Sequence, residues 1–187
     1  MKKTKRLLLV SILFIGILSV PITAATPQQT YAGSQLATLQ LLKGYEDGSL
    51  RLDQNINRAE MTVLLLRVLG HEESIVIGAE KQQFQDVSSS YWGKPWIQKA
   101  AQLQLIQGYP GRTFRPVQPI SYAETIALMV RVLKREEQLE GEWPINYMNR
   151  GKELGIVSPT LKKGPNEVLT RGEVAEIVWK TLLVKTK

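Results

Sequence analysis

The feature that most constrains the fold of this chain is an internal repeat of uneven period. Residues 41–70 align without a gap on residues 105–134, so that Glu60 meets Glu124, 64 positions later. A third copy follows, in which Glu173 lies a further 49 positions along the chain. Near the start of the third copy, residues lie 51 positions after their counterparts in the second copy. The third copy is therefore two residues shorter in the loop between its helices. Such a chain must pack equivalent elements against one another.

Each copy contains two predicted helices joined by a turn-rich loop. In the most complete copy, Ser90 or a neighbouring serine is expected to start the first helix, and Gly108 to end it in the left-handed C′ conformation, as Gly44 does in the first copy. The stretches YEDGSLRL and YPGRTFRP follow, and their Gly, Pro and Asp residues predict loops rather than strands.

The second helix of each copy opens with a capping box. Asn57, Ser121 and Thr170 are good N-cap residues, and each is followed three positions later by a glutamate. An apolar stripe with helical spacing then follows in every copy. One such stripe cannot bury itself. The sequence therefore predicts an all-α fold in which three second helices meet around an axis and the first helices lie outside.

The N-terminal segment predicts a secretory signal peptide within residues 1–32. Four basic residues precede an apolar run from Leu7 to Val20, which is short for a membrane span, and small residues follow it. Cleavage is possible after Ala24, Ala25 or Ala32. The expected repeats are residues 33–70, truncated at the start, 84–133 and 142–184.

Composition excludes several classes of function. The chain has no cysteine and a single histidine, His71, so disulfides, thiolate chemistry and multi-histidine metal sites are not expected. Removal of the signal peptide leaves 20 basic and 17 acidic side chains, and this small excess argues against nucleic-acid binding. The repeated glutamates are explained by capping, so an enzyme is not expected, and no cofactor is implied.

An arginine directly follows the N-cap residue in two copies, at Arg58 and Arg171, whereas the second copy has Tyr122. The start of a helix disfavours a cation by about 0.3–1 kcal/mol because of the helix dipole. Unpaired N–H groups and a guanidinium together would instead form a site for an anion. A solvated surface role, or pairing with acidic neighbours, is the alternative.

These motifs resemble the S-layer homology (SLH) family. The chain shows FQDV at residues 84–87, then Trp92, then GYPGRTFRP at residues 108–116, and the three variants INRAE, ISYAE and LTRGE. The resemblance covers residues 39–183. It implies three repeats in a pseudo-threefold, three-pronged spindle around a central three-helix bundle.

The resemblance also implies a function. SLH domains hold bacterial surface proteins non-covalently on a pyruvylated secondary cell wall polysaccharide linked to peptidoglycan. The family's binding arginine falls on Arg58 and Arg171, in grooves between prongs, and Tyr122 replaces it in the second copy. The expected location is the secreted, cell-wall or S-layer fraction of the bacterial surface, without membrane attachment after cleavage; the sequence does not indicate the oligomeric state.

Further candidate binding residues lie near the loops. Flat rings pack against the C–H faces of sugars, which makes Tyr45, Tyr109, Trp92 and Trp143 candidates beside Gly44 and Gly108. For the two tryptophans a core role is slightly favoured. Asp86 is expected to cap the first helix or to orient a groove residue, with capping favoured.

A rival hypothesis keeps the fold but changes the partner. Tyr122 and the shortened first copy are also what decayed polymer binding would leave. The chain would then be a protein–protein or peptidoglycan interaction module.

Overall fold

The computed structural model describes residues 24–75 and 83–185, and the expected signal peptide lies largely outside these residues. In the described part the secondary structure is helical, apart from isolated bridges. The elements are α1 (Pro27–Thr38), α2 (Arg58–Val68), the short 3-10 helix η1 (Glu72–Ser74), α3 (Lys94–Gln102), α4 (Tyr122–Val132), α5 (Ile145–Glu153) and α6 (Arg171–Leu182). The expected all-α class is confirmed.

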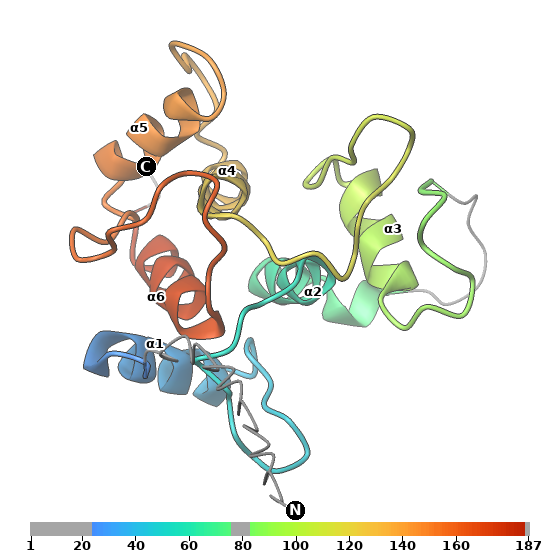
Figure 1. Cartoon of the computed structure of the whole chain (residues 1–187), viewed down its shortest axis with the longest axis horizontal. Coiled ribbons are helices and arrows are strands. Elements are labelled where there is room, and N and C mark those ends of the chain that lie inside the picture. Colours follow the sequence, from blue (N-terminus) through green and yellow to red (C-terminus); the bar gives the residue numbers. More distant parts are fainter. Residues whose placement is uncertain (1–23, 76–82, 186–187) are drawn as a thin grey trace, which may run out of the picture.

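The helices form three pairs, called prongs here, that radiate from a common centre (Figure 1). Each prong joins the second helix of one copy to the first helix of the next: α3 packs on α2, and α5 packs on α4. The third prong joins α1 to α6, which are the first and last helices of the described chain. The spindle is therefore closed by contacts between its two ends.

A ring of loops at the centre holds the three copies together. The backbone N–H of Arg58 donates to the Gln118 carbonyl at 3.0 Å, and that of Arg171 donates to the Gln54 carbonyl at 2.7 Å. The same bond recurs in the middle copy, from Tyr122 to Glu167 at 2.9 Å. Each copy thus binds the loop of another copy in cyclic order.

Capping boxes start α2, α4 and α6 as expected. In each, the cap side chain accepts from the backbone of the glutamate, whose carboxylate accepts from the cap backbone. The central helices are buried on most sides, because each contacts an outer helix as well as the centre. Their buried side chains join a single apolar cluster.

The outer helices differ from expectation at three points. Helix α1 begins at Pro27, with Thr26 as a capping-box residue, so the first copy has a full outer helix that starts inside the range assigned to the signal peptide. Helix α3 begins at Lys94 with Gly93 as its N-cap, and no serine caps it. The left-handed position after α1 and α3 is taken by Gln40 and Gln104, not by the glycines expected there.

Gly44 and Gly108 are needed for close approach instead of for a left-handed turn. A Cβ on Gly108 would lie 2.6 Å from the Thr113 carbonyl oxygen and 2.5 Å from the Phe84 ring. At Gly44 it would lie 2.9 Å from the Ser49 carbonyl oxygen. Both glycines therefore let the loop fold back on itself next to the prong.

Candidate functional site: two equivalent grooves between prongs

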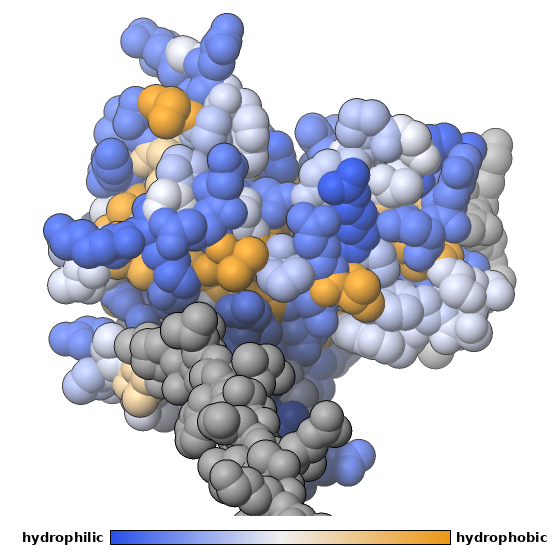
Figure 2. Space-filling view, in the orientation of Figure 1, coloured by the Kyte–Doolittle hydropathy of each residue, from blue (hydrophilic) through white to orange (hydrophobic). Residues whose placement is uncertain are grey.

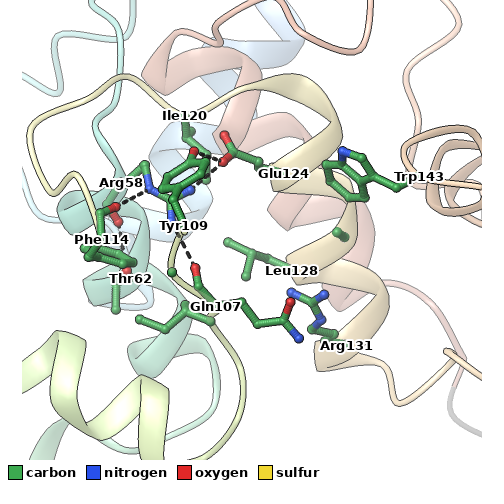
Figure 3. A pocket seen from close by; sticks show the side chains of 13 residues that line it. Arg58, Thr62, Gln107, Tyr109, Phe114, Ile120, Glu124, Leu128, Arg131 and Trp143 are labelled. Atoms are coloured by element: carbon green, nitrogen blue, oxygen red, sulfur yellow. Dashed lines mark hydrogen bonds and ion pairs between the residues drawn. The ribbon is translucent and has the colours of Figure 1, made fainter. Parts of the chain in front are cut away.

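The first candidate site, called groove A, is a cavity of about 230 Å³ between the α2/α3 prong and the α4/α5 prong. Arg58 and Tyr109 line it on one side, Glu124 and Arg131 on the other, and Trp143 stands at its edge (Figure 3). Apolar side chains, among them Leu128, form part of the lining. The cavity therefore combines a charged end with an apolar wall and an aromatic rim.

The second site, groove B, is a cavity of about 270 Å³ with an equivalent set of residues. It lies between the α6/α1 prong and the α2/α3 prong. Its lining includes Arg171, Tyr45, Glu60, Arg67 and Trp92. Each of the last four lies 64 or 51 positions before its counterpart in groove A, so the internal repeat places the same chemistry at two junctions.

The structure thus brings eight of the predicted site residues together in these two grooves. Groove A contains Arg58, Gly108, Tyr109 and Trp143, and groove B contains Arg171, Gly44, Tyr45 and Trp92. The two tryptophan side chains are 52% and 55% exposed, so the favoured core role is wrong for both. Their exposed rings are accessible to a ligand.

The two arginines are buried, at 8% and 5% exposure, and bind the protein itself. Arg58 donates from Nε to the Phe114 carbonyl at 2.8 Å, from Nη2 to the Gln107 carbonyl at 3.3 Å, and from Nη1 to Glu124 (Figure 3). A guanidinium has five N–H donors. Two N–H groups of Arg58 are therefore left over after its contacts with described residues.

Arg171 repeats this arrangement with a looser ion pair. It donates to the Leu50 carbonyl at 2.8 Å and to the Lys43 carbonyl at 3.0 Å, and its Nη1 lies 3.8 Å from Glu60. The accepting carbonyls are again 64 positions before those in groove A. Both arginines therefore tie the loop of one prong to the helix of the next.

The expected anion site made of free helix N–H groups is not present at these helix starts. The first two amides of α2 donate to the Gln118 and Pro116 carbonyls, and the third donates to the Asn57 side chain. The first two amides of α6 likewise donate to Gln54 and Leu52. An anion in either groove would meet guanidinium N–H groups and side chains, not the helix backbone.

Electrostatics keep Glu124 ionised. Burial alone would raise the pKa of its carboxyl, but hydrogen bonds from Tyr109 and Ser121, together with the Arg58 charge, outweigh burial and lower the pKa. Burial, and then the bond to Glu124, raise the pKa of Tyr109, which stays protonated and donates to that carboxylate. The charged end of groove A is thus a fixed network.

Each groove tyrosine also contacts two guanidinium groups. Arg58 lies 4.8 Å and Arg115 4.2 Å from the centre of the Tyr109 ring. In groove B the corresponding distances from Tyr45 are 5.1 Å to Arg171 and 3.8 Å to Arg51. These cation–π contacts hold the rings in place.

Two predicted site residues lie outside the grooves. Asp86 accepts from the backbone N–H groups of Phe114 and Arg115, at 2.8 and 2.6 Å, so it orients the groove loop and does not cap α3. Tyr122 is 2% exposed and its hydroxyl has no hydrogen-bond partner among the described residues. Neither side chain lines groove A or groove B.

Sequence reasoning missed four charged groove residues that recur in the repeat. Glu60 and Glu124 were explained by capping alone, and Arg67 and Arg131 were not proposed as site residues, yet all four line a groove. The capping role is real, but the same carboxylates also face the arginines. Their exact recurrence in the repeat was the available signal.

The described residues give no sign of a metal centre or a membrane span. Among them no group of three His, Cys, Asp or Glu side chains could hold a metal ion. Within the same ranges no helix has the length and apolar character required to cross a membrane. On the face shown in Figure 2, the apolar residues of the described part form small, separate patches surrounded by hydrophilic residues.

Comparison with known proteins identifies the family to which this chain is similar. The family model of the S-layer homology domain matches residues 34–62 and 83–126. The chain therefore contains the S-layer homology domain over these two segments.

Three relatives illustrate the relationship. The middle cell wall protein of Brevibacillus brevis is 29% identical over 80% of this chain and 14% of its own length. A cell surface protein of Thermoanaerobacter kivui is 30% identical over 98% of this chain and 25% of its own length. The cellulosome-anchoring protein of Acetivibrio thermocellus is 26% identical over 75% of this chain and 35% of its own length. The chain thus spans only a minor part of each relative, and their names agree with the surface location expected from the sequence.

Proposed function

We propose that this chain attaches non-covalently to an anionic, pyruvylated secondary cell wall polysaccharide at the bacterial surface, and that grooves A and B are the binding sites. The observation that carries the proposal is the repeated set of buried arginine, tyrosine and half-exposed tryptophan at two junctions. The matched family is a binding module, and relatives named as cell wall and anchoring proteins support a partner in the wall.

Each part of a groove suits one part of such a ligand. The exposed ring of Trp143 or Trp92 offers a flat surface for a sugar face. The guanidinium N–H groups that remain after the contacts to the loop carbonyls can donate to a carboxylate. Because the arginine is already held by the protein, it loses little conformational entropy when a ligand binds.

Groove B is the more cationic of the two. Lys43, Arg67 and Arg171 line it against one glutamate, Glu60. In groove A the lining has only two arginines against one glutamate. An acidic ligand is therefore expected to bind groove B more tightly, and this preference should weaken as salt concentration rises.

The test is sedimentation of the mature protein with purified cell walls. We expect binding to intact walls, and none to walls whose secondary polymer has been removed by acid. The double variant Trp92→Ala/Trp143→Ala should lose binding without unfolding, because both rings are about half exposed. Tyr31→Ala, which removes an aromatic ring that is 57% exposed and lines neither groove, is the matched control.

Two results would contradict the proposal. Undiminished binding by the double tryptophan variant would mean that the grooves are not the site. Equal binding to stripped walls would favour the rival hypothesis, an interaction module for peptidoglycan or another wall protein.

A further inference from the structure

The third junction, between the α4/α5 prong and the α6/α1 prong, is built from different residues. Tyr122 stands where the other junctions have Arg58 and Arg171. Lys163 stands ten positions before Glu173, the place taken by Leu50 and Phe114 before their own glutamates. The junction has therefore lost a cation on the helix side and gained one on the loop side.

Lys163 binds the same kinds of group as Arg58 and Arg171 do, but within its own copy instead of across to another copy. Its Nζ donates to Glu173 at 2.7 Å and to the Val168 carbonyl at 2.7 Å. The side chains of Lys163 and Glu173 are 23% and 11% exposed. As at the other two junctions, one cation binds the capping glutamate and a loop carbonyl together.

The remaining wall of this junction is also changed. Glu176 occupies the position of Val63 and Ala127, which line grooves B and A. Its side chain is 10% exposed and lies 3.2 Å from Lys180. This added carboxylate pairs with Lys180, the counterpart of groove residues Arg67 and Arg131, so that cation is already engaged and the junction disfavours an acidic ligand.

We propose that Lys163 replaces the arginine as the cation of the third junction, and that this junction is a structural clasp closed to acidic ligands. The second half rests on the proposed function, because it concerns the number of binding grooves. Lys163 and Glu173 then hold the loop of the third copy onto α6, while the backbone N–H groups of Tyr122 and Ala123 bind that loop to α4. Under this proposal the polymer binds at grooves A and B and not at this junction.

The clasp is tested by a double-mutant cycle on thermal stability. Lys163→Leu leaves the Glu173 carboxylate without its cation and should lower Tm by about 4–8 °C. Lys163→Leu/Glu173→Gln removes both charges and should lose less than the sum of the single changes. Lys162→Leu, at the exposed neighbouring residue, is the matched control and should leave Tm unchanged.

A transplant provides a second, independent measurement. Tyr122→Arg/Lys163→Leu recreates the arrangement of the other two junctions and should recover at least half of the Tm lost in Lys163→Leu. If the Tm losses of the two single variants simply add up in the double variant, the proposed Lys163–Glu173 interaction is wrong. A Lys163→Leu protein as stable as the Lys162→Leu control would overturn the clasp as well.

Ligand number separates the two proposals. Titration calorimetry with a hexoside carrying a 4,6-pyruvate ketal should give two sites per chain. Three sites would overturn the closed junction while supporting the proposed function. Absence of binding would overturn the proposed ligand, and the stability cycle would still decide the role of Lys163.

Discussion

Truncation of Arg58 tests whether this side chain supports the fold as well as the groove. In Arg58→Ala the Glu124 carboxylate, whose side chain is 20% exposed, loses its cation, and two loop carbonyls lose a donor. Removing one member of a buried pair costs about 3–5 kcal/mol, and since Glu124 keeps some exposure and other donors we expect about 2–3 kcal/mol. For a domain of this size that corresponds to a fall in Tm of about 4–12 °C.

The assay is thermal unfolding followed by circular dichroism at 222 nm, with two companion variants. Arg171→Ala should cost less, because its ion pair with Glu60 is longer, at 3.8 Å. Arg51→Ala removes a surface ion pair with Asp47 and should change stability by less than about 1 kcal/mol. A stable Arg58→Ala protein that fails to bind walls would refute the reasoning, because the guanidinium would then be a free ligand group.

Three further predictions follow from packing, ionisation and chain closure. Gly108→Ala should destabilise the domain by about 1–3 kcal/mol in urea unfolding, since its Cβ meets a carbonyl and the Phe84 ring; wild-type stability would contradict that close approach. The Glu124 carboxyl has a folded pKa below its ordinary value of 4.5, so its contribution is complete above that pH and is lost as pH falls through the folded pKa. The urea midpoint of the wild type should therefore fall more between pH 7 and pH 3 than that of Glu124→Gln, and equal falls would contradict the network. Mass spectrometry of the secreted protein should show an N-terminus at Ala25 or Thr26, because cleavage after Ala32 would remove the cap and half of α1; a chain beginning at Gly33 that is equally stable would contradict this.

Much of the architecture follows from local signals in the sequence. The N-cap residue and the glutamate three positions later set the start of α2, α4 and α6, because those hydrogen bonds lie within one turn. The repeat predicted three equivalent units, since the same motifs recur in the same order and each unit must bury the same apolar face. The all-α class and the loop character of YEDGSLRL and YPGRTFRP followed from the same local chemistry.

Which helices pack against each other could not be predicted from these local signals. Helix α1 packs on α6 because the ring of copies closes end to end, and no local pattern in either helix specifies the other. Helix α1 itself has a local start signal, a capping box formed by Thr26 and Gln29, but that signal lay inside the range assigned to the signal peptide.

The candidate site, too, was determined partly by the sequence and partly by the tertiary structure. The sequence by itself determined which residue types recur and placed an arginine, a tyrosine and a tryptophan at matching positions of the repeat. Only the tertiary structure decided that the helix amides are already bonded to a neighbouring loop, that Arg58 is buried against Glu124, and that Lys163 binds Glu173. The physical reason is distance along the chain: capping acts across three residues, whereas the Arg58–Glu124 contact joins residues 66 positions apart and exists only after the copies have packed together.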